Sequence, residues 1–184
     1  QDLKEAMRDE YKGTPIDNLG NYSSAGEEII YLCPSSQLEG RKYLFVTEKG
    51  MVKLVEGSEF VASKKTIAAT KLVDNDRVSS IIITDARSMP SEENPEETVI
   101  VSNQTIVLQS ANGYFIKFPL AEIPEKKKAA AGVRGMKLEN NDKIEDVYLI
   151  PEGADITIDY KGREVSLKKL KTAKRDGKGT KLRA

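Results

Sequence analysis

The residues best suited to chemistry are the basic side chains of the segment "KKKAAAGVRG", residues 126–135. Three consecutive lysines are followed by small residues and then by one arginine between two glycines. Lysine and arginine bind phosphate, and glycine lets a backbone approach a charged ligand closely. The segment therefore indicates phosphate binding, and by itself it leaves open whether the phosphate belongs to a nucleotide or to a polymer.

Similar basic clusters occur earlier and later in the chain. A single lysine on a turn is most often only solvated, but clusters that recur at matched positions favour a line of phosphates such as duplex DNA. We therefore predict a DNA-binding set made of three clusters. Its members are Lys64, Lys65, Lys71, Lys126, Lys127, Lys128, Arg134, Lys137, Lys168, Lys169, Lys171, Lys174, Arg175, Lys178, Lys181 and Arg183.

The glycines near the end of the chain do not form a nucleotide-binding loop. A P-loop requires a glycine, four residues, and then Gly-Lys-Ser/Thr. In "DGKGTK", residues 176–181, Gly179 follows Lys178 where Ser or Thr is needed, and no glycine precedes Gly177 at the required spacing. The sequence thus predicts no nucleotide and no other small-molecule substrate.

Residues that could perform catalysis or bind a metal are scarce. The chain has no histidine and a single cysteine, Cys33, which follows the apolar run "EEIIYLC" and is predicted to be a buried thiol. The acidic segments "SEENPEE" and "NND" have turn compositions. We therefore predict no catalytic residue, no metal site, no cofactor and no enzymatic activity for this domain alone.

The charges are distributed unevenly although the formal net charge is +0. Residues 161–184 carry a balance of +8 and residues 1–160 a balance of −8. A basic end on an acidic body indicates either a binding surface for a polyanion or a disordered tail. There is no signal-peptide pattern and no long apolar run, so we expect a cytoplasmic protein without a membrane partner. The start at Gln1 suggests a fragment of a longer protein.

The elements that must position these residues are predicted to be β-strands. Short runs rich in β-branched residues recur, and glycine-containing turns such as "TEKG" and "SANG" separate them. Residues 2–10 and 166–174 have a helix-like composition, but neither is expected to form a helix, and the acidic segment 85–98 is expected to be a solvated loop. The predicted strands are "EEIIYLC", "KYLFVT", "MVKLV", "VSSIIIT", "TVIVS", "TIVLQ", "YFIKF", "EDVYLI", "DITIDY" and "REVSL".

An internal repeat organises these strands. Gly50 matches Gly113, the turn "DNDRV" matches "NNDKI", and the pairs Lys71-Leu72, Lys137-Leu138 and Lys181-Leu182 recur. The approximate repeats are residues 1–41, 42–97, 98–150 and 151–184. Each repeat offers about four short strands, which is the content of one propeller blade. We therefore predict an all-β fold, a single domain over residues 1–184 with about three to four four-stranded blades.

The segments "YKGTPIDNL", "NGYFIKFPLAEIP" and "AAAGVRGMKLENNDKI" resemble the C-terminal domains of the A subunits of DNA gyrase and of the related topoisomerase IV. The resemblance implies a β-pinwheel, a propeller-like disc whose basic rim bends and wraps duplex DNA in a type IIA topoisomerase. The implied partners are DNA, the remainder of the A subunit, and the ATPase subunit. It also implies that the catalytic tyrosine lies in another domain, so the tyrosines of this chain are structural.

Two features depart from the gyrase pattern. The family's basic box, Gln-Arg-Arg-Gly-Gly-Lys-Gly, has its nearest match in "AKRDGKG", residues 173–179, where Ala173 and Asp176 do not fit. This match lies in the last repeat, which is not where the family usually carries the box. The chain also holds roughly three and a half repeats, fewer than the six common in gyrase. Gyrase and topoisomerase IV types both stay open.

The function expected from these observations is non-catalytic, sequence-nonspecific binding and bending of duplex DNA. The alternative is a propeller-like protein interaction module that binds through the acidic body. Binding to DNA across a range of salt concentrations distinguishes the two.

Overall fold

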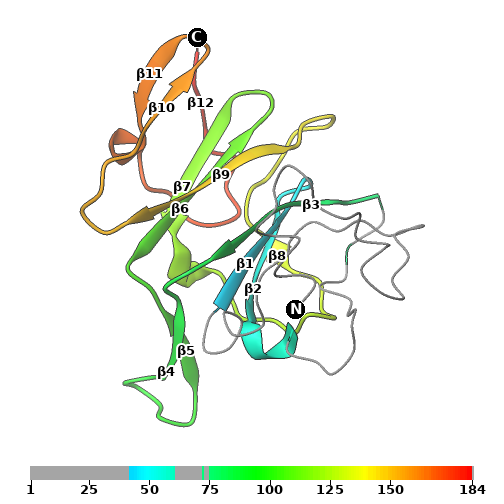
Figure 1. Ribbon diagram of the computed structural model, residues 1–184, viewed down its shortest axis with the longest axis vertical. Helices are drawn as coiled ribbons and strands as arrows, with labels where there is room; N and C mark the ends of the chain where they lie inside the picture. The colour runs from blue at the N-terminus through cyan, green and yellow to red at the C-terminus, as the bar shows by residue number, and fades with distance from the viewer. Residues whose placement is uncertain (1–41, 61–71, 73–74, 184) are drawn as a thin grey trace, which may run out of the picture.

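The computed structural model describes residues 42–60, 72 and 75–183, which form β-strands joined by turns and short 3-10 turns (Figure 1). No α-helix occurs in this part of the chain, and it contains no helix long and apolar enough to cross a bilayer. The all-β prediction is confirmed. Cys33, the predicted strand at residues 27–33 and the helix-like segment at residues 2–10 lie outside the described residues.

The first four-stranded sheet joins strands from two repeats. Runs of β-branched and aromatic residues favour its strands, all of which pair antiparallel to their neighbours. In spatial order they are β3 (Val78–Ile83), β1 (Lys42–Thr47), β2 (Met51–Glu56) and β8 (Val133–Arg134). The short strand β8 comes from the following repeat and places Val133 opposite Val52.

The second four-stranded sheet repeats this arrangement. Its strands, again antiparallel and in spatial order, are β9 (Ile144–Pro151), β6 (Gln104–Ser110), β7 (Tyr114–Pro119) and β12 (Thr180–Lys181). Here β12 comes from the next repeat and places Thr180 opposite Phe115. Each four-stranded sheet therefore takes three strands from one repeat and its fourth strand from the repeat that follows.

The matched turns of the sequence are also matched in structure. Gly50 and Gly113 adopt positive φ angles of 83° and 87°, which glycine reaches without a steric penalty. Asp76 and Asp142 each accept two backbone N–H hydrogen bonds through Oδ1, at 2.8 to 3.0 Å. One donor in each case lies in the neighbouring hairpin turn. The glycines and acidic turns of the internal repeat are thus confirmed as equivalent.

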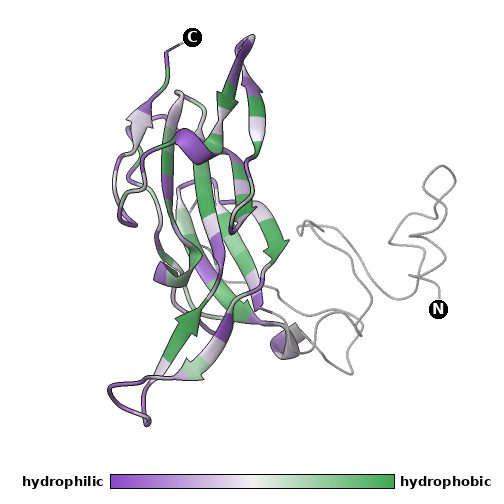
Figure 2. Cartoon of the chain, turned by 90° about the vertical axis from the view of Figure 1, so that its left-hand side faces the viewer, coloured by the Kyte–Doolittle hydropathy of each residue, from purple (hydrophilic) through white to green (hydrophobic). Residues whose placement is uncertain are grey.

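The main core lies between the two four-stranded sheets. Alternate residues of β1, β2, β6 and β7 belong to it. Hydrophobic residues form green bands along the strands in Figure 2. Burial of each large side chain contributes roughly 1.5–3 kcal/mol. The fully buried residues of the core include Leu44, Val46, Leu54, Ile106, Leu108, Phe118, Leu120, Ile123 and Met136.

A two-stranded hairpin covers the opposite face of the second sheet. It consists of β10 (Thr157–Tyr160) and β11 (Arg163–Ser166). Phe115 of β7 meets Tyr160 edge to face, with ring centroids 5.3 Å apart, and Leu167 is buried in the same cluster. The second sheet is therefore covered on both faces, by the first sheet on one face and by the β10–β11 hairpin on the other.

A second hairpin was only partly predicted. The sequence placed all of residues 85–98 in a solvated loop, but β4 (Arg87–Pro90) pairs with β5 (Thr98–Val101). Proline at the strand end lacks an N–H without disrupting the ladder, which is why Pro90 is tolerated there. The acidic tip between the strands is exposed, as expected. This hairpin projects at the bottom of Figure 1, away from β10 and β11.

Three short 3-10 turns complete the described part. They are η3 (Gly57–Phe60), η4 (Leu120–Glu122) and η5 (Leu167–Lys169). The helix-like segment at residues 166–174 contains only the single turn η5, so the expectation that it forms no helix is confirmed.

Candidate nucleic-acid interface

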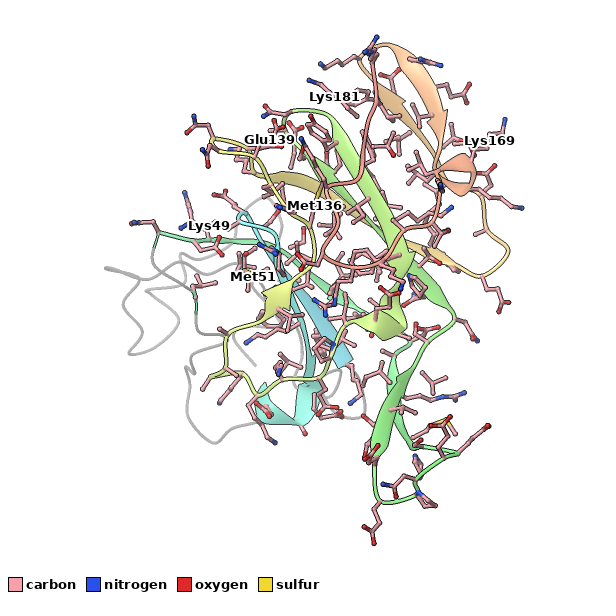
Figure 3. The ribbon with its side chains drawn as sticks, turned by 180° about the vertical axis from the view of Figure 1, so that it is seen from behind. Lys49, Met51, Met136, Glu139, Lys169 and Lys181 are labelled. Carbon is pink, nitrogen blue, oxygen red and sulfur yellow. The ribbon has the colours of Figure 1, made fainter. Side chains whose placement is uncertain are left out.

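The predicted basic set lies almost entirely at the surface. Lys64, Lys65 and Lys71 lie outside the described residues, and of the others only Lys128 and Arg175 are half-buried. The exposed members are Lys126, Lys127, Arg134, Lys137, Lys168, Lys169, Lys171, Lys174, Lys178, Lys181 and Arg183. Lys169 and Lys181 lie at the end of the molecule opposite the β4–β5 hairpin (Figure 3).

The first lysine turn, residues 126–130, is attached to the edge of β2. Leu54 donates its N–H to the Pro124 carbonyl at 3.1 Å and accepts the Lys126 N–H at 2.8 Å. The Glu59 carboxylate accepts the backbone N–H of Lys128 at 2.6 Å and lies 3.3 Å from the Lys127 ammonium. These contacts fix the backbone of the turn while its lysines stay at or near the surface.

Lys53 of β2 lies beneath this turn and is only 3% exposed. Its ammonium donates to the carbonyl oxygens of Lys127, Lys128 and Ala130 at 3.4, 2.9 and 2.9 Å. Burial lowers the pKa of Lys53 to about 8, and the nearby Glu59 carboxylate only partly offsets this effect. Lys53 is not a member of the predicted DNA-binding set, although a lysine inside the apolar run "MVKLV" is a visible signal in the sequence.

The second lysine turn, residues 167–171, has a similar support. Lys117 of β7 donates to the carbonyl oxygens of Leu167 and Lys168 at 3.2 and 2.9 Å. Desolvation lowers the pKa of Lys117, against a smaller opposing effect of Asp155. Lys117 was also missed, and it too interrupts an apolar run, "YFIKF".

Close backbone contacts set the position of β8 and β12. A Cβ at Gly132 would lie 2.5 Å from the Val52 carbonyl oxygen, and a Cβ at Gly179 would overlap the Phe115 carbonyl oxygen in the same way. Gly135 and Leu182 donate their N–H groups to the carbonyls of the two hairpin glycines, at 2.8 and 2.9 Å.

These contacts correct one part of the repeat alignment. The structure matches residues 132–135 with residues 179–182, so Lys181 corresponds to Arg134. The predicted match of Lys137-Leu138 with Lys181-Leu182 is therefore wrong, because Lys181 lies where Arg134 lies and not where Lys137 lies. Arg134 and Lys181 occupy the same place in their two sheets, each opposite the first residue of the neighbouring long strand.

The glycine loop, residues 173–179, folds back onto the segment that follows β8. Lys137 donates its N–H to the Gly177 carbonyl at 2.8 Å, and Asp176 donates its N–H to the Gly135 carbonyl at 2.9 Å. Arg175 donates a side-chain N–H to the Arg134 carbonyl at 2.7 Å. The loop therefore connects the last repeat to the one before it.

Two ion pairs join this loop to neighbouring segments. Asp176 pairs with Arg134, which lowers the pKa of the Asp176 carboxyl and raises that of the guanidinium. Lys178 lies 2.6 Å from Glu139, and this pairing lowers the pKa of Glu139 and raises the pKa of Lys178. Asp176, which broke the expected basic box, is thus the partner of Arg134.

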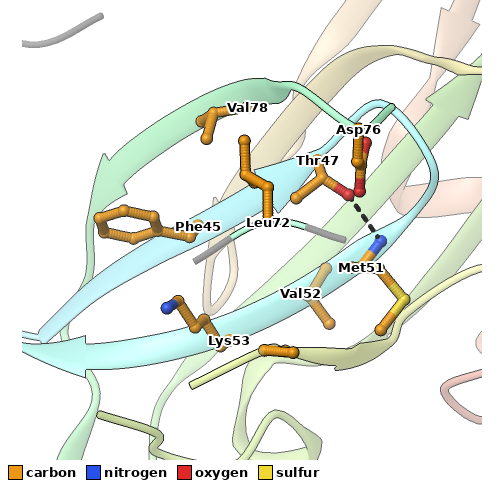
Figure 4. Close-up of a pocket in the computed structure, with 10 residues that line it drawn as sticks. Phe45, Thr47, Met51, Val52, Lys53, Leu72, Asp76 and Val78 are labelled. Carbon is orange, nitrogen blue, oxygen red and sulfur yellow. Dashed lines mark hydrogen bonds between the residues drawn. The ribbon is translucent and has the colours of Figure 1, made fainter. Parts of the chain in front are cut away.

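A pocket lies beside β1 and β2. Phe45, Thr47, Lys53, Leu72 and Asp76 contribute to its lining, and the Thr47 hydroxyl oxygen accepts the Met51 N–H at 3.1 Å (Figure 4). No group of three or more His, Cys, Asp and Glu residues in the described ranges is placed to hold a metal ion.

The comparisons with known proteins bear on this arrangement. The family model described as DNA gyrase C-terminal domain, beta-propeller, matches residues 41–85 and 104–151, which is half of the chain. The chain belongs to this family of DNA gyrase C-terminal domains. The match covers both four-stranded sheets except β12 and does not include the β4–β5 hairpin.

Relatives of this gyrase-type domain are bacterial. The DNA gyrase A subunit of Lawsonia intracellularis is 26% identical over 91% of this chain and 19% of its own length. The DNA topoisomerase 4 A subunit of Streptococcus pneumoniae is 25% identical over 83% of this chain and 18% of its own length. The chain therefore spans less than a fifth of these relatives.

A solved structure of a DNA gyrase A C-terminal domain has the same fold. It superposes with a TM-score of 0.65 at 23% sequence identity and covers 93% of this chain and 53% of that chain. The predicted propeller-like β-pinwheel is thereby confirmed as the fold class.

Proposed function

We propose that this chain binds and bends duplex DNA without sequence preference, as a non-catalytic module of a type IIA topoisomerase. The observation that carries the proposal is the repetition of exposed cations at equivalent structural positions. Arg134 and Lys181 occupy the same place in the two sheets, and a lysine turn lies beside each sheet. Regularly spaced cations on successive blades match a continuous row of phosphates.

Two groups of cations contribute in different ways. Exposed ion pairs such as Arg134–Asp176 contribute about 0–1 kcal/mol, so phosphate replaces the carboxylate at little cost. Other ammonium groups have no side-chain hydrogen bond or ion pair within the described residues and are free for phosphate. These are Lys126, Lys137, Lys168, Lys169, Lys171 and Lys174.

The test is duplex DNA binding by the chain across a series of salt concentrations. If about five to eight phosphates are neutralised, log K falls against log salt with a slope of about −4 to −7. Duplexes of unrelated sequence bind equally, because phosphate contacts carry no sequence information. Salt-independent affinity, or tight binding to one sequence alone, overturns the proposal.

The remaining parts of the proposal follow from this role. Residues 1–184 form one domain of three to four blades whose partners are DNA, the rest of the A subunit, and the ATPase subunit. The location is cytoplasmic, where bacterial DNA is found. The isolated chain neither cleaves DNA strands nor hydrolyses nucleotides. DNA nicking by the purified chain that disappears when a single carboxylate is substituted would contradict this expectation.

A second candidate function is protein binding through the β4–β5 hairpin. Met89 and Val99 face each other across this hairpin and are each 43% exposed. Large exposed apolar side chains beside an acidic tip are typical of an interaction site. Passage through a heparin column without retention favours this function over DNA binding.

A further inference from the structure

Two lysines outside the predicted set, Lys53 and Lys117, lie within long strands. Lys53 alternates with Val52 and Leu54, and Lys117 lies between Ile116 and Phe118. Those four neighbours belong to the core between the two sheets. Because successive side chains point to opposite faces of a strand, both lysines point away from this core.

Each of these lysines collects carbonyl oxygens of a lysine turn from the following repeat. Lys53 donates to three carbonyls of residues 127–130, at 3.4, 2.9 and 2.9 Å. Lys117 donates to two carbonyls of residues 167–168, at 3.2 and 2.9 Å. The backbone oxygens of each turn point toward the lysine of the strand, and most lysine side chains of the two turns are exposed.

The buried charge of Lys53 is unfavourable for the fold itself. A protonated lysine that is 3% exposed and hydrogen-bonded to neutral carbonyls loses more hydration than it regains. The lowered pKa of Lys53 is the sign of this cost. A methionine would fill a similar volume without the charge, so fold stability does not explain a lysine at this position.

We propose that Lys53 and Lys117 are positioning residues for DNA binding, each holding the backbone of a lysine turn so that the turn presents several ammonium groups to the phosphates. The inference rests on the proposed DNA-binding function. Neither lysine touches DNA in this scheme. Each acts through the exposed lysines above it, which are Lys126 and Lys127 in the first turn and Lys168, Lys169 and Lys171 in the second.

The charged groups around the two ammonium groups are of both signs. Glu59 of η3 is the charged group that acts on Lys53, and the same carboxylate pairs with Lys127. Asp76 lines the same pocket as Lys53, whose ammonium also lies 5.4 Å from the centre of the Phe45 ring. Asp155 is the main charge facing Lys117, beside the lysines of the second turn.

The decisive measurement is the salt slope of DNA binding for Lys53→Met and Lys117→Met at neutral pH. Loss of one exposed phosphate contact lowers the slope by about 1. Lys53→Met releases a whole lysine turn from its support, so we expect the magnitude of the salt slope to fall by about 2. We expect the same change for Lys117→Met. The matched control is Lys143→Met, which removes an exposed charge that supports no lysine turn and lowers the slope by about 1 at most.

A pH series provides a readout that a purely structural role does not change. Exposed lysines keep their charge between pH 7 and pH 9, whereas Lys53, with a pKa of about 8, loses its proton. DNA affinity of the unsubstituted chain therefore falls over this range more steeply than that of Lys53→Met. Identical pH profiles for the two proteins overturn the inference. If circular dichroism shows that Lys53→Met does not fold, constant affinity of the unsubstituted chain from pH 7 to pH 9 overturns it.

The outcomes separate this inference from the proposed function. If the unsubstituted chain shows no salt-dependent DNA binding, the proposed function fails and the inference fails with it. If the unsubstituted chain binds with the expected slope and both methionine variants match the Lys143→Met control, only the positioning role is overturned.

Discussion

The first lysine turn and the glycine loop both carry clustered cations, but the protein supports them differently. A buried ammonium, that of Lys53, holds the backbone of the turn from below and leaves Lys126 without a side-chain partner within the described residues. The loop is instead joined to other segments by ion pairs, in which its Asp176 pairs with Arg134 of β8 and its Lys178 pairs with Glu139. One region holds its lysines on a backbone fixed by a buried ammonium, and only Lys127 among them has an ion pair, whereas the other is held by ion pairs on both Arg134 and Lys178.

The largest expected difference between the two regions is in DNA affinity. Replacement of Lys126, Lys127 and Lys128 by alanine should lower the salt slope by about 2 to 3, equivalent to about a hundredfold weaker binding at physiological salt. The matching triple, Lys174, Arg175 and Lys178 to alanine, should lower it by about 1, because the Arg175 guanidinium is engaged by the Glu122 and Arg134 carbonyls and Lys178 pairs with Glu139. Gel shifts at several salt concentrations measure both, and equal losses would remove the distinction.

The attachment of the glycine loop to the second sheet is tested by two alanine substitutions. Gly179 and Gly153 have nearly the same positive φ, 78° and 76°, but an added Cβ overlaps the Phe115 carbonyl only at Gly179. Gly179→Ala should lower the free energy of unfolding by about 2 kcal/mol more than Gly153→Ala. Chemical denaturation measures the difference, and similar values for the two variants would show that the loop does not need this contact.

The charge beneath the first lysine turn makes a prediction for fold stability. The folded pKa of Lys53, about 8, lies below its unfolded value of 10.5, so between these values the unfolded chain binds more protons. Relative to Lys53→Met, the unfolding free energy of the unsubstituted chain should therefore rise by about 1–2 kcal/mol from pH 8 to pH 10. Denaturation curves at these pH values give the comparison, and a parallel pH dependence would contradict it.

The smallest expected effect is a gain in DNA affinity when the carboxylates that pair with Arg134 and Lys178 are removed. Asp176→Asn and Glu139→Gln each release one cation, Arg134 or Lys178, and should strengthen DNA binding about threefold to fivefold at physiological salt. Glu145→Gln, at an exposed carboxylate that has no ion pair with any cation in the described part of the chain, is the control for the loss of one negative charge. No gain beyond this control would mean that the ion pairs do not compete with phosphate.

Much of the fold could be predicted because the repeat is encoded locally. Gly50 and Gly113 mark hairpin turns that require positive φ, and apolar runs between such turns favour strands. The strands β8 and β12 were missed because each contains only two residues and draws its stability from a neighbouring repeat. β4 was missed because Pro90 and the glutamates around it are typical of loops.

The candidate site was predicted in its composition but not in its contacts. Basic clusters are visible in a sequence, and the exposure of nearly all described members agrees with a surface role. Pairings such as Arg134 with Asp176 join residues far apart in the chain, so no local pattern reveals them. Lys53 and Lys117 were overlooked because a lysine in a strand is normally expected to point to solvent rather than to buried carbonyls.

The exchange of short strands between repeats has a consequence for how the chain folds. Each four-stranded sheet is completed by a segment that is synthesised after the next hairpin, so neither sheet closes until its successor has begun to form. The folding of each repeat should therefore be coupled to the folding of the next, because each interface between two repeats stabilises both of them. A truncation after residue 150 would leave β7 as an open edge, which is a template for intermolecular pairing and aggregation.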